Sequence, residues 1–404
     1  MYDVYKIRKD FPVFQNSKTI YLDNAATTYK PQSVIDSVTK YLSKETANSG
    51  RGDYHDAYVV DKRVDDTRLL VQKFLNAKEE DEIIFTHGTT MSLNLVAQSY
   101  GKKVLKPGDE ILLSIAEHAS NTLPWFDVAK VTGAKVVFMP LDDKGLITPE
   151  IVKKHLTPRT KIVAVTHISN VLGYINEIKS IAKVIHENGS VIVVDGAQSA
   201  PHLKIDVQDL DIDFFAFSGH KMLAPTGIGV LYGKKELLAV MDPFFSGGGM
   251  NASYTTDGKV DIFKAPRKFE AGTLNIEAIY GLHSAIIYLQ KIGLENIAAH
   301  ELTLKKYALN ELRKLDHIII YNEDAPTGII TFNVRGVHSQ DAATYFSSKN
   351  IALRSGQHCA KLLKNHLHEM ATVRASIYLY TTKEDIDAFI NAAKTAEDFL
   401  DAYF

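Results

Sequence analysis

Seven short apolar runs alternate with helix-like segments through the middle of the chain, and this alternation constrains the fold more than any other feature. Several of these runs are apolar on consecutive residues, which is typical of strands covered on both faces. Helical patterns, such as residues 92–100 and 177–187, lie between them. The alternation predicts an α/β fold with a mostly parallel, seven-stranded sheet. The predicted strands are residues 83–85, 111–113, 136–138, 162–165, 191–194, 214–217 and 228–231.

The last third of the chain predicts a smaller α+β unit. Its long helical pattern is followed by mixed strands and helices, and no Pro/Ser-rich linker precedes it. We predict a large domain over residues 17–280 and a small domain built from residues 1–16 and 281–404. Residues 244–268 contain three consecutive glycines and little periodicity, which favours a long functional or interface loop. In the small unit, helices are predicted at 276–315, 339–349 and 383–400, and strands at 318–321, 328–334 and 375–380.

Composition and charge exclude several other classes of protein. The 404 residues include 46 Lys plus Arg and 48 Asp plus Glu, so the formal net charge of -2 gives no basic surface for nucleic acid. No apolar run approaches the roughly 18 residues of a membrane span, and the first residues lack the apolar core of a signal peptide. The single cysteine, Cys359, cannot form an internal disulfide. We therefore expect a cytoplasmic protein that binds neither nucleic acid nor membrane.

Polar residues follow the predicted strands, at the sheet edge where open α/β sheets bind ligands. After the first strand, Thr89 and Thr90 begin a helix behind Gly88, which predicts a phosphate-binding turn. A plain helix cap remains an alternative, because Thr is a common cap residue. After the second strand, His118 can stack on a flat ligand or move a proton, although a simple hydrogen-bonded loop histidine remains open. Asn170, after the fourth strand, is a candidate polar donor.

A carboxylate and a lysine follow the next two strands. Asp195 ends an apolar strand, where a buried carboxylate is costly unless it meets a cation or caps a helix. Lys221 follows an aromatic strand beside Ser218 and His220, and a partly desolvated lysine can bond an aldehyde, although most lysines are simply surface residues. Together with the phosphate turn, these groups fit pyridoxal 5'-phosphate. The histidines show no metal-ligand spacing, so no metal site is expected.

Four motifs resemble a known enzyme family. The segments DGAQ at residues 195–198 and SGHK at 218–221 resemble the class V branch of the fold-type I pyridoxal-phosphate enzymes. The segments RSGQHCA at 354–360 and VRAS at 373–376 are similar to those of cysteine desulfurases, in particular the group II members, which are Suf-type or selenocysteine-lyase-like. The similarity runs from residue 21 to the C-terminal helix. Where the family often has two histidines before the cysteine, this chain has Gln357 in the first position.

The resemblance implies a role for each matching residue. The implied catalytic residues are Lys221, which would bond the cofactor and act as the base, Cys359, which would be the sulfur-accepting nucleophile, and His118, which would stack on the cofactor ring. A free cysteine is usually a small buried residue, but this one lies in a polar segment beside Arg354 and His358, which can favour its thiolate. The implied cofactor ligands are Thr89, Thr90, His118, Asp195, Gln198, Ser218, His220, Lys221 and, from the partner subunit of a homodimer, Thr273. The implied ligands of the substrate are Asn170, Arg354 and Arg374.

The resemblance further implies a reaction. L-cysteine would yield L-alanine and a persulfide on Cys359, and an external thiol, either small or on an acceptor protein, would remove the sulfur for iron–sulfur cluster or other thio-cofactor assembly. The sequence leaves open a selenocysteine lyase, a cysteine sulfinate desulfinase or an aminotransferase on the same fold. A scaffold without chemistry is the non-enzymatic alternative, and the presence of Lys221, Asp195 and Cys359 argues against it.

Overall fold

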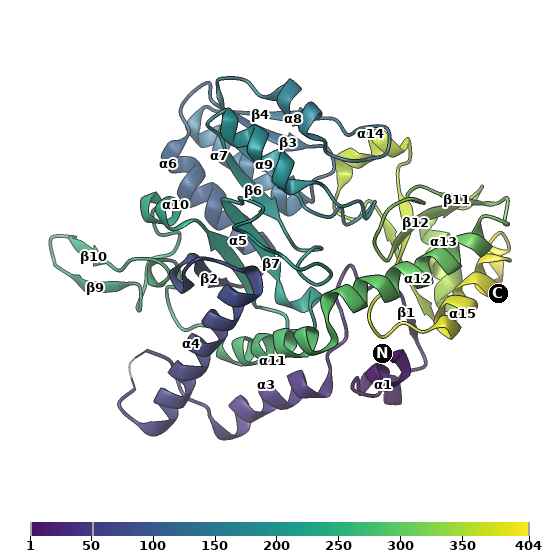
Figure 1. Ribbon diagram of the computed structural model, residues 1–404, viewed down its shortest axis with the longest axis horizontal. Coiled ribbons are helices and arrows are strands. Elements are labelled where there is room, and N and C mark those ends of the chain that lie inside the picture. Colours follow the sequence, from purple (N-terminus) through teal and green to yellow (C-terminus); the bar gives the residue numbers. More distant parts are fainter. Residues whose placement is uncertain (1, 51, 403–404) are drawn as a thin grey trace.

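The computed structural model describes residues 2–50 and 52–402, and its largest element is a seven-stranded sheet (Figure 1). The strand order is β2-β8-β7-β6-β5-β3-β4, and β8 alone runs antiparallel to its neighbours. Each of the seven predicted runs contributes one strand, so the predicted mostly parallel sheet is confirmed. The strands are β2 (Ile83–Thr86), β3 (Glu110–Ser114), β4 (Lys135–Met139), β5 (Thr160–Thr166), β6 (Val191–Asp195), β7 (Phe214–Ser218) and β8 (Gly229–Gly233).

Both faces of this sheet are covered by helices, which explains why its strands are apolar on consecutive residues. In β6, Ile192 and Val194 belong to the core on one face, whereas Val193 belongs to the core on the other. The first core includes α4 (His55–Leu75), α8 (Pro149–His155), α9 (Ile178–Glu187) and α11 (Ile276–Ile292). The second includes α5 (Thr89–Leu95), α7 (Leu123–Thr132) and α10 (Lys235–Val240).

A four-stranded antiparallel sheet with order β11-β12-β15-β14 forms the core of the last third. Figure 1 shows α11 and α12 leading from beneath the large sheet to this smaller one, with a break at Gly293. The proposed domain division stays a prediction, and residue 280 falls within α11. The elements are α12 (Leu294–Leu312), α13 (Ser339–Ser348), α15 (Lys383–Ala393), β11 (Ile318–Ile320), β12 (Ile329–Val334), β14 (Arg354–Gly356) and β15 (Thr372–Ser376).

Short elements complete the chain. Strand β1 pairs in parallel with β13, which brings the N-terminal segment against the smaller sheet. Within the described ranges, no helix combines the length and apolar character needed to cross a bilayer. The remaining elements include α1 (Val4–Arg8), α2 (Val13–Asn16), β1 (Ile20–Tyr21), α3 (Gln32–Lys44), α6 (Lys102–Val104), β13 (Ile351–Ala352) and α14 (Lys364–Leu367).

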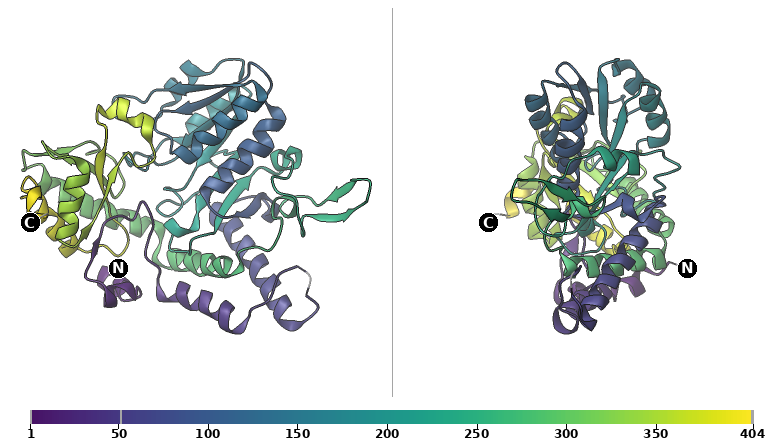
Figure 2. Two further views of the ribbon diagram at one scale, coloured as in Figure 1. Left: turned by 180° about the vertical axis from the view of Figure 1, so that it is seen from behind. Right: turned by 90° about the vertical axis from the view of Figure 1, so that its left-hand side faces the viewer.

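Three expectations about elements were wrong. The predicted strand at 375–380 ends at Ser376, because the chain turns at residues 378–381, where the N–H of Thr381 donates to the carbonyl of Tyr378. The predicted helix at 383–400 ends at Ala393. The predicted loop at 244–268 contains a hairpin of β9 (Asn251–Tyr254) and β10 (Val260–Ile262), which stands clear of the body (Figure 2).

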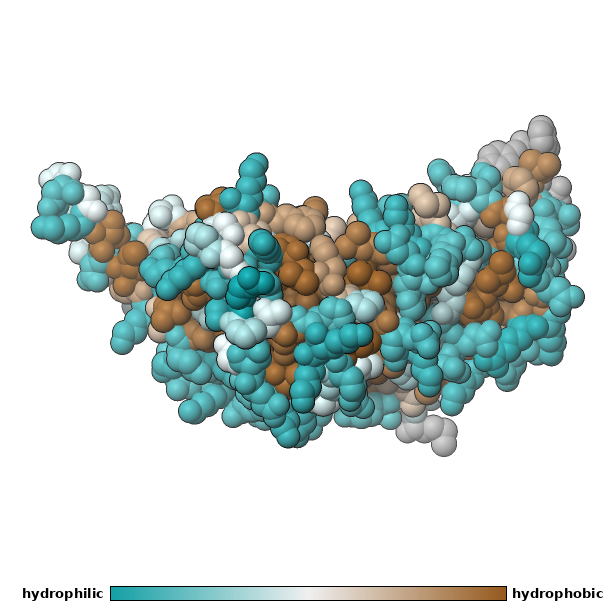
Figure 3. Space-filling model, turned by 90° about the horizontal axis from the view of Figure 1, so that it is seen from above, coloured by the Kyte–Doolittle hydropathy of each residue, from teal (hydrophilic) through white to brown (hydrophobic). Residues whose placement is uncertain are grey.

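The hairpin exposes apolar side chains to solvent. Tyr254 is 76%, Val260 51% and Ile262 40% exposed. Figure 3 shows the hairpin projecting from one end of the molecule with apolar residues along its stem. Large exposed apolar side chains on a projecting element are typical of a contact surface.

Candidate active site

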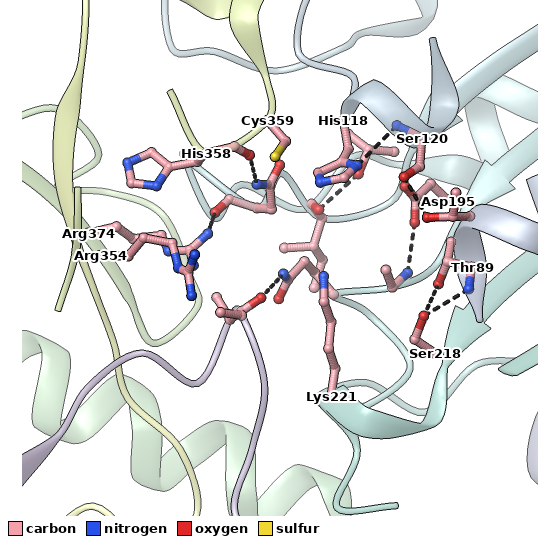
Figure 4. Close-up of a pocket in the computed structure, with 18 of the residues that line it drawn as sticks. Thr89, His118, Ser120, Asp195, Ser218, Lys221, Arg354, His358, Cys359 and Arg374 are labelled. Carbon is pink, nitrogen blue, oxygen red and sulfur yellow. Dashed lines mark hydrogen bonds between the residues drawn. The ribbon is translucent and has the colours of Figure 1, made fainter. Parts of the chain in front are cut away.

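A pocket of about 530 Å³ lies at the carboxyl ends of the large-sheet strands, facing the smaller sheet (Figure 4). This is the edge at which open α/β sheets bind ligands. The structure thus brings together residues from strands and loops that are far apart in the sequence. All predicted site residues except Thr273 line it: Thr89, Thr90, His118, Asn170, Asp195, Gln198, Ser218, His220, Lys221, Arg354, Cys359 and Arg374.

Hydroxyl groups and a helix start form one end of the pocket. The backbone N–H of Thr89 donates to Ser218 Oγ at 2.8 Å, and the two side-chain hydroxyls lie 2.7 Å apart. Thr90 Oγ1 lies 2.7 Å from the hydroxyl of Ser120, which the sequence reasoning missed. Burial, together with the nearby Lys221, lowers the pKa of His220 to about 4. The arrangement offers neutral donors and a helix N-terminus to an anion such as phosphate.

Asp195 and Lys221 both line the pocket, and their opposite charges interact. Asp195 is only 5% exposed, and its Oδ1 accepts from the N–H of Ala197 at 2.9 Å. No described residue donates a hydrogen bond to its Oδ2. Burial lowers the pKa of Lys221 to about 8, an effect that the negative charge of Asp195 opposes. Figure 4 shows the Lys221 side chain extending into the pocket.

These groups fit pyridoxal 5'-phosphate. A buried carboxylate with a free oxygen suits the protonated pyridine nitrogen, because a buried charge requires a partner. A lysine with a lowered pKa suits the aldehyde, and the hydroxyls at the helix start suit the phosphate. Gln198 is held in place, because its Nε2 donates to the carbonyl of Ala25 at 2.8 Å.

His118 is fixed by its neighbours. Its Nδ1 accepts from the N–H of Ser120 at 3.1 Å, and burial lowers its pKa. Glu117, the residue before His118, was not recognised from the sequence as part of the site. The Glu117 carboxyl is 4% exposed and accepts from Asn121 Nδ2 at 2.7 Å and from the N–H of Thr166 at 3.1 Å. Glu117 therefore ties the turn that carries His118 to the end of β5.

Two arginines form the side of the pocket next to the smaller sheet. Arg374 is 2% exposed, and its Nη1 donates to the carbonyl of Asn170 at 2.8 Å. The side-chain amide of Asn170 donates to the carbonyl of His358 at 2.8 Å, so Asn170 holds both Arg374 and the cysteine loop. Asp23 contacts Arg354 and Arg374 together and was not recognised from the sequence. The arrangement suits a carboxylate ligand.

The cysteine loop is held in an unusual backbone conformation. His358 and Cys359 have φ angles of 49° and 59°, in the left-handed region that costs non-glycine residues about 1–2 kcal/mol each. The carbonyl of Cys359 accepts from the N–H of Ala119 at 2.7 Å, while its side chain is exposed. The alternative of a small buried cysteine is therefore wrong. Strain of this kind often accompanies a functional constraint.

His358 does not supply the cation that was expected beside the thiol. Its side chain is 7% exposed, and its Nε2 lies 3.0 Å from Thr372 Oγ1. Burial lowers its pKa to about 3, and the positive charge of Arg374 contributes, so the imidazole is neutral at pH 7. Of the two residues expected to favour the thiolate, only Arg354 carries a charge.

Thr273 lies outside the pocket. It lines a separate hollow together with Gly248, Gly249 and Gly272, near the base of the hairpin. This segment is anchored by Glu270, which makes two hydrogen bonds of 2.8 Å to Arg68. Thr273 therefore does not reach the pocket of its own chain.

Comparison with known proteins places the chain in a family. Residues 20–389 match the aminotransferase class-V family. A protein of Halalkalibacterium halodurans named probable cysteine desulfurase is 45% identical over 409 residues, which covers all of both chains. The crystal structure of the cysteine desulfurase CsdA from Escherichia coli superposes with a TM-score of 0.93 at 39% identity, over 98% of this chain and 99% of that one. The cysteine desulfurase of Thermococcus onnurineus has a TM-score of 0.92 at 36% identity, over 97% of each.

The chain belongs to the aminotransferase class-V family and, within it, to the cysteine desulfurases. The resemblance, the fold class and the pyridoxal-phosphate cofactor predicted from the sequence are confirmed. The assignment to group II stays a prediction, as do the individual roles of the pocket residues.

Proposed function

We propose that this protein converts L-cysteine to L-alanine and takes the sulfur onto Cys359 as a persulfide. One observation carries the proposal: the exposed thiol of Cys359 lies in the same pocket as Lys221 and Asp195. Lys221 and Asp195 fit any enzyme that uses pyridoxal phosphate, but an aminotransferase needs no thiol at this place.

The cofactor, when bound, supplies an electron sink for the substrate α-carbon. Asp195 would keep the pyridine nitrogen protonated, and His118 and Gln198 would hold the ring. Lys221, whose lowered pKa leaves a substantial neutral fraction near pH 8, would move the proton at the α-carbon. The phosphate would be held by Thr89, Thr90, Ser218 and His220.

The substrate would be held by its carboxylate and attacked at its sulfur. Arg374, assisted by Arg354 and Asn170, would bind the carboxylate through charge-assisted hydrogen bonds. The Cys359 thiolate would bond to the substrate sulfur while the carbon–sulfur bond breaks. The carbon then takes up a proton and becomes the methyl group of alanine.

A product assay tests this function. With L-cysteine, cofactor and a thiol reductant, we expect equal amounts of alanine and sulfide. Pyruvate and ammonia in place of alanine would indicate a lyase, and amino transfer to a keto acid would indicate an aminotransferase. Either result would reject the proposal.

We further propose a homodimer whose two sites are shared. Two observations support it: Thr273 lies outside the pocket of its own chain, and the nearby hairpin exposes apolar residues. Thr273 of one subunit would reach the phosphate bound in the other. In a symmetric dimer this contact occurs twice.

Subunit mixing tests the shared site. Lys221→Ala and Thr273→Ala proteins, each impaired alone, should regain activity when mixed, because each heterodimer has one site with both lesions and one with neither. The measurement is alanine formation after exchange, with heterodimers confirmed by native mass spectrometry. If Thr273 acted within its own chain, both sites would stay damaged and no activity would return.

The sulfur must leave through a group outside the chain. Cys359 is the only cysteine, so no second thiol of this protomer can resolve its persulfide. We propose that a small thiol or a cysteine on an acceptor protein takes the sulfur, for iron–sulfur cluster or other thio-cofactor assembly. A single free cysteine also suits the proposed cytoplasmic location.

A further inference from the structure

A short turn between β3 and α7 contacts three separate parts of the pocket. It carries His118, whose side chain lines the pocket, and the hydroxyl of Ser120 lies 2.7 Å from Thr90 Oγ1, at the end proposed for the phosphate. Between them, the N–H of Ala119 donates to the carbonyl of Cys359 at 2.7 Å. Figure 4 shows His118, Ser120 and Cys359 along the same side of the pocket. This turn therefore connects the ring position, the phosphate end and the cysteine loop.

Glu117 anchors the turn, which spans residues 117–121, to two strands of the large sheet. Its carboxyl accepts from Ser114 Oγ at 2.5 Å, at the end of β3, and from the N–H of Thr166 at 3.1 Å, at the end of β5. Asn121 Nδ2, at the other end of the turn, donates to the second carboxyl oxygen at 2.7 Å. The three bonds tie both ends of the turn to the sheet, although Glu117 itself does not line the pocket.

The Glu117 carboxyl is buried among neutral donors. It is 4% exposed, and among the described residues its hydrogen-bond partners are a hydroxyl, an amide and a backbone N–H. Burial, together with the negative charge of Asp195, raises the pKa of Glu117 to about 8, so the neutral acid predominates at pH 7. Glu117 therefore contributes hydrogen bonds rather than a charge, and a neutral amide can take its place.

The cysteine loop is held from the large-sheet side. His358 and Cys359 have φ angles of 49° and 59°, a conformation that non-glycine residues keep only where their surroundings impose it. Their two carbonyls each accept one hydrogen bond from a loop of the large sheet. Asn170 Nδ2 donates to the first at 2.8 Å, and the N–H of Ala119 donates to the second at 2.7 Å. The bond from Ala119 is made to the residue that carries the thiol, so the position of the turn sets the position of Cys359.

We propose that Glu117 is a positioning residue that holds the sulfur nucleophile in register with the cofactor ring. It acts through the turn: the bonds that fix His118 at the ring position also place the N–H of Ala119 against the carbonyl of Cys359. Loss of these bonds lets the turn move and displaces the thiol from the reacting sulfur. The inference rests on the proposed function, because it takes Cys359 as the sulfur acceptor.

Two rates, each measured per bound cofactor, test this role in Glu117→Ala. Exchange of the α-proton of L-alanine with solvent needs Lys221 and the cofactor but no thiol, whereas single-turnover persulfide formation from L-cysteine also needs Cys359. We expect persulfide formation to fall by up to about a hundredfold, the effect of a misplacement of about 1 Å. The α-proton exchange should fall much less, because Lys221 and Asp195 are unchanged. A loss of stability alone would leave the ratio of the two rates unmoved.

Hydrogen–deuterium exchange reads the loop directly, without turnover. In Glu117→Ala, backbone exchange in the peptide that contains residues 354–363 should become faster than in the wild type, because the loop loses a fixed donor. Mass spectrometry of the substrate-free protein measures it. The same peptide in the Glu110→Ala protein should exchange at the wild-type rate.

Glu110→Ala is the matched control variant for both measurements. Glu110 begins the same strand, β3, is 6% exposed and accepts from Thr157 Oγ1 at 2.6 Å, but it lies at the end of the strand away from the pocket. Its removal deletes a buried carboxyl of the same strand without touching the turn. The ratio of the two rates should therefore stay at the wild-type value.

Glu117→Gln is the conservative variant and should restore the wild-type ratio. The amide oxygen can accept from Ser114 and Thr166 in place of one carboxyl oxygen. The amide nitrogen can donate to Asn121, whose Oδ1 is buried and has no partner among the described residues, once the Asn121 amide turns over. The three bonds are thus kept without a charge.

Ala119→Pro tests the link between the turn and the cysteine loop. Proline has no N–H, so this variant removes the bond to Cys359 and leaves Glu117 in place. The backbone suits proline, because His118 is extended (φ -62°, ψ 147°) and Ala119 begins a 3₁₀ turn. We expect slower persulfide formation and faster exchange in the loop, with α-proton exchange close to that of the wild type.

The outcomes decide the role of Glu117. An unchanged ratio in Glu117→Ala, a ratio that falls equally in Glu110→Ala, or a Glu117→Gln protein as impaired as Glu117→Ala would overturn the proposal. If Glu117→Ala does not fold, Asn121→Ala removes one of the three bonds and should lower the ratio in the same direction; an unchanged ratio there has the same consequence. A wild type that makes no alanine from L-cysteine rejects the proposed function, whereas an active wild type with an unmoved ratio in the variants rejects only the role of Glu117.

Discussion

Replacing Lys221 with alanine should lower alanine formation by about a thousandfold or more while leaving the fold intact, since a positioned base alone contributes about 10²–10⁴-fold. Lys221 enters the centre of the pocket, and burial lowers its pKa to about 8, so it can both bond an aldehyde and move a proton near neutral pH. Neither Asp195 nor the residues proposed to hold the phosphate are altered in this variant, so it should still bind the cofactor. The measurements are alanine formation and the amount of cofactor that remains after gel filtration.

Borohydride reduction followed by peptide mass mapping identifies the bonded lysine. Three other lysines have pKa values lowered by burial and are alternatives: Lys30, at about 8, Lys305, at about 7, and Lys268. Lys305 Nζ donates to two backbone carbonyls at 2.7 and 3.0 Å and does not line the pocket. We expect the borohydride label on Lys221 alone. The matched control variant, Lys30→Gln, should still be labelled at Lys221. A label on any of these three lysines would contradict the assignment.

The large sheet was predictable because its strands are buried on both faces. In β6, consecutive apolar residues from Val191 to Val194 face cores on opposite sides, and this leaves a strong local pattern. Strand β14 left no such pattern. Its residues Arg354–Gly356 are polar, and only pairing with β15 makes them a strand. The apolar run after Ser376 was misleading because the chain turns at residues 378–381 although its residues are apolar and buried.

The pocket was predictable where its residues directly follow strands. Asp195 and Lys221 sit at strand ends, and the chemistry of each residue type points to a role. Asp23 could not be found in this way, because it reaches the arginines from a segment more than 300 residues away in sequence. The neutral state of His358 depends on burial, which no local pattern reveals.

Without an external thiol, the enzyme should form about one alanine per site quickly and then slow sharply, because the chain offers one acceptor sulfur. Cys359 is exposed on a loop whose carbonyl is fixed by Ala119, so the thiol reaches the pocket while its backbone stays in place. Once the persulfide has formed, this protomer has no second cysteine to remove it. Adding a thiol reductant should restore continuous turnover.

Cys359→Ser is the matched variant for this step, since serine keeps the size of the side chain and removes the sulfur nucleophile. It should bind the cofactor and respond to L-cysteine in its absorbance, because Lys221, Asp195 and Arg374 are unchanged, but it should form no persulfide. Rapid-quench measurement of alanine, with and without reductant, and the intact mass of the protein test both expectations. Sustained alanine formation by Cys359→Ser, or an added sulfur atom on that variant, would show that Cys359 is not the acceptor.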